Sequence, residues 1–519
     1  MPAGCGHELA RLRVCGEKAS AGERRRDAGL THSPQRSTVR LIETYDVIVI
    51  GSGPAGEKAA AHAAYFGRRV AVIEREPWLG GVVVRDGGIP TKTLRETALY
   101  VTGFHKRELY GVAPAIDRVR TMEVLRARAA AVAQLVEQQV RANFDRHGVD
   151  IVHGQARLTA PGRVTVRATD GGERELASPV VLIATGSRPF HPPVFDFDDP
   201  DVLDSESLLT VRSLVGSVAV VGGGPIGCEY ASILRALAIE VSLVDVAPRL
   251  CSMLDAEISD RLAESFRGLD IDLRLPASVE SVRHTDRGLE LSLDRGNPLT
   301  VDKLLVAAGR AGNTEDLGLD EVGVKLDSRG RVIVGADFQT SCPGVYAAGD
   351  VIGPPALASV AMEEGRLAAS FALGTRLHEG VRFQPPFGIY GVPEVAAVGM
   401  TEQDAAAQGI DYAVGRAEFA GNVRAVIAGA PDGIVKLVFR RDDRCLLGVH
   451  VIGEQAAEII HLGQAVLQNG GGLDYFIQAP FNVPTWTDAY KYAAFDGLQQ
   501  LEPGAPLRAR AHAITSATN

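Results

Sequence analysis

The stretch that most constrains the fold is Tyr45–Glu74, where two apolar runs enclose a glycine-rich turn and an alanine-rich segment. The first run, Val47–Ile50, leads into the sequence GSGPAG at residues 51–56, and the second, Val70–Ile73, ends in Glu74. The order of strand, tight turn, helix and strand, with GxGxxG spacing, is typical of a dinucleotide-binding βαβ unit.

Each part of this turn has a physical role. Gly51 allows the tight turn, Gly53 lets the backbone approach a pyrophosphate, and Gly56 lets the helix pack closely on the strand. The phosphates would meet unpaired N–H groups at the positive end of the helix, and Glu74 would accept hydrogen bonds from ribose hydroxyls. The residues predicted to bind this first nucleotide are Gly51, Gly53, Pro54, Ala55, Gly56, Glu74 and Arg75.

A second βαβ pattern begins with the apolar run Ser217–Val221 and the sequence GGGPIG at residues 222–227. It ends in Asp245, whose carboxylate would bind a ribose 2′-hydroxyl and repel a 2′-phosphate. The first positive charge beyond it is Arg249, so this loop by itself favours NAD(H) over NADP(H). The residues predicted to bind this second nucleotide are Gly222, Gly224, Pro225, Ile226, Gly227 and Asp245.

Composition narrows the function classes. A chain of 519 residues is too long for one core, and its net charge of −10 argues against nucleic acid as a partner. No segment has the apolar length that a membrane span needs, so no membrane partner is expected. The six cysteines are scattered, which predicts a reducing, cytoplasmic location, and no metal-ligand spacing occurs, so no metal is expected. Residues 1–42, rich in arginine, are predicted to be a disordered extension; the alternatives are an upstream start codon assigned in error and a targeting peptide.

Residues 80–92, GGVVVRDGGIPTK, resemble the flavin-side helix of the pyridine nucleotide–disulfide oxidoreductases. In dithiol-using members this stretch carries a CxxxxC pair against the flavin. Here Val83 and Gly88 occupy the two cysteine positions, and neither can form a disulfide or a thiolate. The resemblance implies that Gly80, Gly81 and Lys92 contribute to the FAD site.

Three further segments resemble FAD-domain signatures of this family. One is the apolar strand that closes in ATGSRP, another is VDKLLVAAG, and the third is GVYAAGD, after which a helix is expected to point its N-terminus at the flavin. The aspartate of the third signature would accept from a ribitol hydroxyl. The resemblance assigns Thr185, Gly186, Gly309, Asp350 and Ala358 to cofactor binding.

The C-terminal part resembles the dimerisation domain of the family and implies a homodimer. Near its end, residues 481–490 read FNVPTWTDAY, where dithiol-using relatives have HxHPTxxE. Val483 replaces the acid–base histidine and Asp488 replaces the glutamate that holds it. Valine cannot transfer protons, so this loss agrees with the loss of the cysteine pair.

The predicted fold class is α/β, with two Rossmann-type dinucleotide-binding domains, one for FAD and one for NAD(P), and a C-terminal α+β dimerisation domain. The expected segments are an extension at 1–42, the FAD domain at 43–190 and 301–380, the NAD(P) domain at 191–300, the dimerisation domain at 381–500 and a tail at 501–519.

Within the family, the chain looks most like the soluble pyridine nucleotide transhydrogenases. This resemblance implies hydride transfer between NAD(H) and NADP(H) through flavin N5, with FAD, NAD and NADP as cofactors and no redox disulfide. Lys92 is expected to lie by the flavin and to pair with Glu229, and both are predicted to be catalytic and cofactor-binding. The alternatives are an NAD(P)H dehydrogenase of the diaphorase or quinone reductase type and a non-catalytic, redox-sensing flavoprotein.

Overall fold

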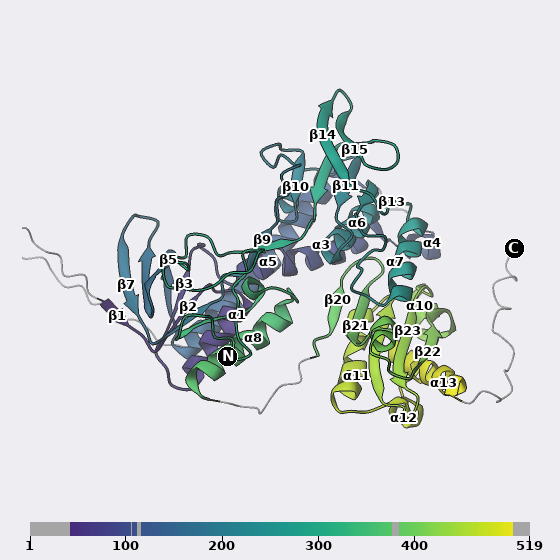
Figure 1. Cartoon of the computed structure of the whole chain (residues 1–519). Helices are drawn as coiled ribbons and strands as arrows, with labels where there is room; N and C mark the ends of the chain where they lie inside the picture. Colours follow the sequence, from purple (N-terminus) through teal and green to yellow (C-terminus); the bar gives the residue numbers. More distant parts are fainter. Residues whose placement is uncertain (1–41, 105, 112–115, 376–383, 502–519) are drawn as a thin grey trace, which may run out of the picture. The chain divides into compact units, whose positions relative to one another are not determined.

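The computed structural model describes residues 42–104, 106–111, 116–375 and 384–501 (Figure 1). The extension and tail predicted at the two ends lie outside the described residues, except for one residue of each. Ile42 is not part of an extension, because it begins strand β1 (Ile42–Thr44), which pairs in parallel with β7 (Glu173–Ala177). Leu501 is the last residue of helix α13 (Ala489–Leu501) and not part of a tail.

The apolar run before the first glycine turn forms the middle strand of a five-stranded parallel sheet. In sheet order, its strands are β19 (Val345–Ala347), β8 (Val180–Ile183), β2 (Val47–Ile50), β3 (Val70–Glu74) and β4 (Asp150–His153). Both faces of this sheet are covered, which explains why β2 and β3 are continuous apolar runs.

Alternate residues of β2 face two different cores. Val47 and Val49 pack with helix α1 (Pro54–Tyr65) and helix α8 (Ala358–Leu373). Ile48 and Ile50 pack with the antiparallel strands that follow β4, because neighbouring side chains of a strand point to opposite faces. These strands are β5 (Gln155–Ala160) and β6 (Arg163–Arg167), and β6 pairs with β7.

A second five-stranded parallel sheet contains the second glycine turn. In order, its strands are β10 (Val202–Asp204), β17 (Lys303–Val306), β11 (Ser217–Val221), β12 (Glu240–Val244) and β13 (Asp272–Arg274). Helices α6 (Pro225–Ala236) and α7 (Ala256–Gly268) follow β11 and β12. An antiparallel sheet of β14 (Val279–Thr285), β15 (Gly288–Leu293) and β16 (Leu299–Val301) is inserted between β13 and β17.

The position of β17 corrects one predicted boundary. The segment from residue 301 was expected to open the second part of the FAD domain, but β17 pairs with β10 and β11 inside the second sheet. The chain leaves this sheet only after Val306. It passes next into β18 (Arg310–Gly312), which pairs with β9 (Ser187–Pro189), so the two connections between the sheets run side by side.

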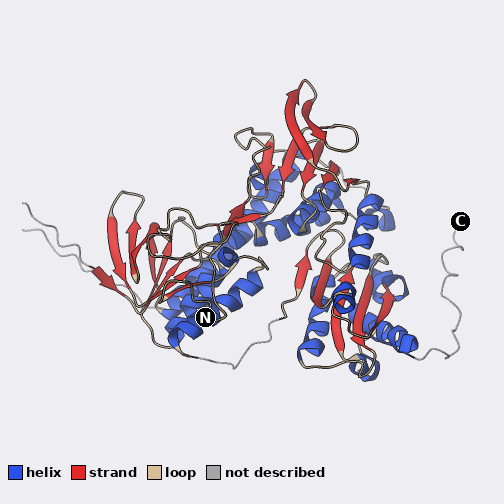
Figure 2. Ribbon diagram, viewed as in Figure 1, coloured by secondary structure: helices blue, strands red, loops and turns tan. Residues whose placement is uncertain are grey.

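The C-terminal part is built on a five-stranded antiparallel sheet flanked by helices (Figure 2). Its strands are β20 (Phe387–Ile389), β21 (Val395–Gly399), β24 (Leu446–Ile452), β23 (Ile434–Arg440) and β22 (Tyr412–Glu418). Helix α11 (Ala456–Gln468) packs on β21 and β24, and α13 packs on β22 and β23. The short helices here are α9 (Glu402–Ala407), α10 (Val423–Ala428) and α12 (Leu473–Gln478). The predicted fold class is therefore confirmed.

Among the described residues, four helices lie between β3 and β4. They are α2 (Gly81–Arg85), α3 (Gly88–Thr102), α4 (Lys106–Tyr110) and α5 (Arg118–His147). The IPTK sequence lies inside α3. The Asp117 side chain caps α5 by accepting from the N–H groups of Val119 and Arg120. None of the described helices combines the length and the apolarity that crossing a bilayer requires.

Candidate functional site

The two glycine turns have the same backbone geometry. Gly51 has a φ of +105° and Gly222 a φ of +116°, a region that favours glycine. A β-carbon on Gly51 would overlap the carbonyl oxygen of Ala184, and one on Gly222 would overlap that of Ala307. Ala184 follows β8 and Ala307 follows β17, so each turn needs glycine both for its φ and to pass beside the neighbouring strand.

The second and third glycines of each GxGxxG motif differ in their surroundings. A β-carbon on Gly56 or on Gly227 would overlap the carbonyl oxygen of the first glycine of the same turn. Nothing lies within 4 Å of the β-carbon position of Gly53 or Gly224. These middle glycines face open space at the starts of α1 and α6, where first-turn N–H groups lack an intrahelical acceptor. Such a space fits a phosphate group.

A cavity of about 430 Å³ extends from the first turn along the carboxyl ends of β2, β3, β8 and β19. This is the edge at which open parallel sheets bind ligands. Of the predicted residues, those that line it are Gly51, Gly53, Pro54, Ala55, Glu74, Arg75, Gly81, Thr185, Gly186, Asp350 and Ala358. We call this cavity the flavin cavity. The residues also assigned to the FAD site that do not line it are Gly56, Gly80, Lys92 and Gly309.

Glu74 is fixed in the wall of the flavin cavity by the turn itself. Its Oε2 accepts from the backbone N–H of Ser52 at 2.9 Å and from the Ser52 hydroxyl at 2.6 Å, and its Oε1 accepts from the N–H of Glu76 at 2.9 Å. Three of about four lone-pair positions are therefore filled, which leaves room for one ribose hydroxyl. The N–H of Gly80 donates to the Ser52 hydroxyl at 3.0 Å, so Gly80 supports the site from behind.

A chain of hydrogen bonds holds Asp350. Its Oδ2 accepts from the Ser187 hydroxyl at 2.8 Å, and the same hydroxyl oxygen accepts from Arg310 Nε at 2.8 Å. Arg310 Nη2 lies 3.3 Å from Glu206 Oε1. Asp350 stands at the start of the 3₁₀ helix Asp350–Ile352, directly after the glycine that follows β19. Its carboxylate thus has a fixed direction in the flavin cavity.

The two residues predicted to be catalytic form an ion pair, with Lys92 Nζ 2.7 Å from Glu229 Oε2. Lys92 lies near the start of α3 and Glu229 near the start of α6, so the pair joins the flavin-side helix to the second nucleotide helix. The backbone N–H of Tyr390 donates to Glu229 Oε1 at 2.8 Å. The Tyr390 ring lies beside the ammonium group, with 5.1 Å between Nζ and the ring centre, a favourable cation–π contact.

The flavin cavity has other side chains where dithiol relatives carry cysteines. Val83 lines it at the first position, and Gly88 begins α3 at the second. A β-carbon on Gly88 would lie 3.2 Å from Val83 Cγ1, so the two positions are adjacent. Asp86 lies between them and also lines the cavity. Burial, and then the nearby Glu206, raises the pKa of Asp86 from 3.8 to about 6.

Asp245 closes the second turn. Its carboxylate accepts from the N–H of Gly223 and from that of Ala247, the latter at 2.6 Å. Arg249 is engaged by Asp260, with Nε 2.8 Å from Oδ1. Pro225, Ile226 and Gly227 form the start of α6, and Gly309, with a φ of +110°, follows β17 and accepts from the N–H of Phe190 at 3.0 Å.

The residues of the flavin cavity fit FAD. The open space at Gly53 suits a pyrophosphate, the remaining lone pair of Glu74 suits a ribose hydroxyl, and the fixed carboxylate of Asp350 suits a hydroxyl of the ribitol chain. The second turn repeats the phosphate cradle and adds Asp245 for a ribose, which fits a nicotinamide nucleotide.

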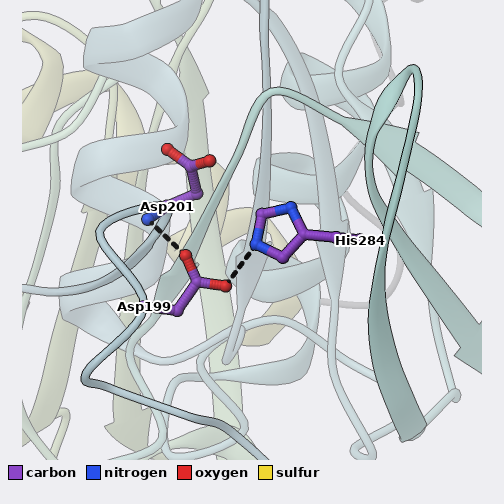
Figure 3. Close-up of side chains that lie close together, drawn as sticks. All are labelled: Asp199, Asp201 and His284. Atoms are coloured by element: carbon purple, nitrogen blue, oxygen red, sulfur yellow. Dashed lines mark hydrogen bonds and ion pairs between the residues drawn. The ribbon is translucent and has the colours of Figure 1, made fainter.

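Among the described residues, one group of three potential metal ligands comes together, and Figure 3 shows it: Asp199, Asp201 and His284. Its atoms have protein partners. Asp199 Oδ2 lies 2.6 Å from His284 Nε2, and Asp199 Oδ1 accepts from the N–H of Asp201 at 2.9 Å. Asp201 Oδ1 pairs with Lys303 Nζ at 2.6 Å. The group is accounted for as an ion-pair network.

Some residues of the site were missed in the sequence. Ser52 and Ser187 lie inside the recognised motifs GSGPAG and ATGSRP, so a hydroxyl beside each turn was a usable signal. Glu206, Arg310 and Tyr390 lie outside the residues to which a role was assigned. Their part in the site follows only from contacts across the fold.

Comparison with known proteins identifies the same organisation. The family described as pyridine nucleotide-disulphide oxidoreductase matches residues 45–365, and the dimerisation domain of that family matches residues 385–494. The soluble pyridine nucleotide transhydrogenase of Mycobacterium tuberculosis is 40% identical over 464 residues, which cover 89% of this chain and 98% of that protein.

Two solved structures have the same fold. LpdA from Mycobacterium tuberculosis superposes with a TM-score of 0.80 at 27% identity, over 88% of this chain and 99% of that one. The HOCl-induced flavoprotein disulfide reductase RclA from Escherichia coli superposes with a TM-score of 0.78 at 26% identity, over 87% of this chain and 99% of that one.

Proposed function

Because the chain belongs to the pyridine nucleotide-disulphide oxidoreductase family, we propose that it is an FAD-dependent transhydrogenase that moves hydride between NAD(H) and NADP(H). The similarity to transhydrogenases at 40% identity over nearly their whole length supports this reaction. The site contains the parts that the reaction needs, namely a cavity that fits FAD and a second turn that fits a nicotinamide nucleotide.

The observation that carries the proposal is the ion pair between Lys92 and Glu229. At 2.7 Å, it ties the helix beside the flavin cavity to the helix that starts at the second nucleotide turn. The pair is retained although Val83 and Gly88 replace the cysteines. A site with this link and without the dithiol suits a reaction whose two substrates are both nicotinamide nucleotides.

The chain's own residues would bind and orient the reactants. FAD, when bound, would supply a ring that can take up a hydride and give it back. The first turn and Asp350 hold FAD, and the second turn and Asp245 hold each nicotinamide nucleotide in succession. Lys92, held by Glu229, would place a positive charge near the helix that starts at the second nucleotide turn. Hydride transfer to a nicotinamide moves no proton, so valine at position 483 is compatible with the reaction.

Binding of NADP(H) depends on two opposing effects on its 2′-phosphate, namely repulsion by Asp245 and attraction by Arg249. Asp245 would repel a 2′-phosphate, and Arg249 would attract it after leaving Asp260. The Arg249–Asp260 pair is exposed, and solvent screens such pairs, so this exchange costs little. Arg249 is therefore our candidate for the group that binds the 2′-phosphate.

We also propose a homodimer in the cytoplasm. The match to the family's dimerisation domain supports the dimer, as do three exposed apolar side chains of α10, Val423, Val426 and Ile427. The cytoplasm is supported by the cysteines of the described residues, which are free thiols. The Cys251 thiol donates a hydrogen bond to Cys228 Sγ at 3.6 Å, and no disulfide joins the two.

The test of the reaction is anaerobic transfer from NADPH to thio-NAD⁺, and from NADH to thio-NADP⁺, by the purified flavoprotein. Fast transfer in both directions is expected. If NADH bleaches the flavin but the 2′-phosphorylated nucleotides are inert, the proposal is wrong and an NADH dehydrogenase with another acceptor takes its place. A protein whose flavin neither nucleotide reduces would be the redox-sensing flavoprotein.

The Lys92→Met variant tests the residue that carries the proposal. We expect it to keep FAD but to slow the reduction of the flavin by NADH in stopped-flow measurements at 450 nm. Lys106→Met, an exposed lysine of α4, is the matched control and should react like the wild type. A folded Lys92→Met protein with the wild-type reduction rate would remove Lys92 from the site.

A further inference from the structure

A second cavity, of about 290 Å³, lies between α3, α5 and the second nucleotide sheet. Its wall is made largely of buried apolar side chains, including Leu94 of α3, Leu125 of α5, Val218 of β11 and Leu234 of α6, and none of these four is more than 6% exposed. We call it the apolar cavity. Its size and its apolar wall fit one small apolar molecule.

One end of the apolar cavity adjoins the flavin cavity. Asp86 and Glu206 line both, so these two side chains stand between them. Arg85 lines the same end; its guanidinium stacks on the Trp78 ring at 4.8 Å, and no ion pair joins it to a carboxylate of the described residues. The carboxylate of Glu206 forms an ion pair with Arg310, with 3.3 Å between Oε1 and Nη2.

The charges at this end define what it would bind. Arg310, outside the cavity lining, pairs with Glu206, and Arg85 lies beside Asp86, so the end has little net charge and favours a neutral ligand over an ion. Arg85 is exposed to solvent and lines this end without a carboxylate to accept its N–H groups, so a ligand with a hydrogen-bond acceptor can replace solvent there. Elsewhere on the wall, Lys303 is paired with Asp201 and Arg126 is exposed to solvent.

We propose that the apolar cavity binds a small, neutral aromatic carbonyl compound, with its ring among the leucines and its carbonyl oxygen directed toward Arg85 and Asp86. Ring burial supplies affinity, and the polar end sets the orientation. A ligand held in this way has its polar end against the wall shared with the flavin cavity.

The protonation of Asp86 should modulate this binding. Burial and Glu206 raise its pKa to about 6, while Arg85 and Arg310 act in the opposite direction and Glu76 adds to the rise. Below this pH the carboxyl is protonated and donates to a carbonyl oxygen, whereas above it the carboxylate repels that oxygen. The affinity should therefore fall as the pH rises through about 6.

This site goes beyond the proposed transhydrogenase and does not depend on it. Transfer of hydride between two nicotinamides needs neither a carboxylic acid with a near-neutral pKa nor an apolar cavity. The apolar cavity and the titration of Asp86 thus have no part in that hydride transfer, although Asp86 also lines the flavin cavity. The thio-NAD⁺ assay on the same preparations reports the transhydrogenase separately from ligand binding.

The test uses the oxidised holoenzyme without reductant, titrated calorimetrically with menadione, a neutral bicyclic carbonyl compound. The wild type should bind one molecule per chain. Ala129→Phe fills the cavity from α5, and Ala130→Phe covers its rim from an exposed position that does not disturb the core. We expect each to weaken binding by about tenfold or more. Ala127→Phe, exposed on the same helix and outside the cavity lining, is the control and should bind like the wild type.

Asp86→Asn adds a test of orientation. The amide remains a donor at every pH, so the dependence of affinity on pH should disappear in this variant. The proposal is overturned if menadione does not bind, if both Ala129→Phe and Ala130→Phe bind it like the wild type, or if NAD⁺ displaces it in competition. Each of these results would place the ligand elsewhere or nowhere.

Discussion

Exchanging the third glycine of one turn for alanine should disable one nucleotide site and leave the other intact. In Gly227→Ala, the new β-carbon would overlap the carbonyl oxygen of Gly222 and lie 3.0 Å from its carbonyl carbon and 3.4 Å from Val220 Cγ1. The β-carbon position lies 1.8 Å from that oxygen. Non-bonded atoms prefer about 3.5–4.0 Å, so α6 or the turn must move by roughly 2 Å.

The size of the effect follows from this displacement. Overpacking of this kind costs about 1–3 kcal/mol, which corresponds to a loss of affinity of roughly tenfold to a hundredfold. We therefore expect the apparent Kd for NADH to rise about tenfold to a hundredfold in Gly227→Ala while FAD stays bound. The same overlap occurs at Gly56, so Gly56→Ala should lose FAD instead.

The assay measures both cofactors in one protein. FAD content is read from the flavin absorbance after gel filtration, and the apparent Kd for NADH from the concentration dependence of flavin reduction in stopped flow. Gly268→Ala at the end of α7 is the control, because nothing lies within 4 Å of its β-carbon position. If Gly227→Ala keeps both FAD and the wild-type Kd, the close contact in the second turn does not hold the site together.

Two further predictions concern buried charge. Lys436 is fully buried, with Nζ 2.7 Å from both Asp255 and Glu402, so Lys436→Met should lower the free energy of unfolding by about 3–5 kcal/mol, measured by urea titration; an unchanged midpoint would contradict this. The folded-state pKa of Asp86 is raised from 3.8 to about 6, so its contribution to stability is present at low pH and is lost as the pH rises through about 6. The Tm of Asp86→Asn should therefore rise relative to that of the wild type as the pH increases from 3.8 to about 6. A Tm difference between the two proteins that does not change with pH would refute the raised pKa.

Features that depend on the identity and spacing of neighbouring residues could be predicted from the sequence. The turns at residues 51–56 and 222–227 were predicted because their glycines are required by local φ and by contacts with an adjoining strand. The strands β2 and β3 were predicted because burial on both faces requires continuous apolar runs. The boundary at residue 300 was wrong, since a short apolar strand such as β17 has the same pattern in either parallel sheet.

The sequence by itself determined that this protein has two dinucleotide turns and lacks thiol and histidine chemistry at Val83, Gly88 and Val483, because these properties depend only on residue identity at fixed spacing. Tertiary structure alone decided that Glu229 accepts a hydrogen bond from Tyr390, which lies 161 residues away in the C-terminal part of the chain. It also decided that Asp86 and Glu206 separate two cavities. Such contacts arise from the packing of helices and sheets, which no local pattern encodes.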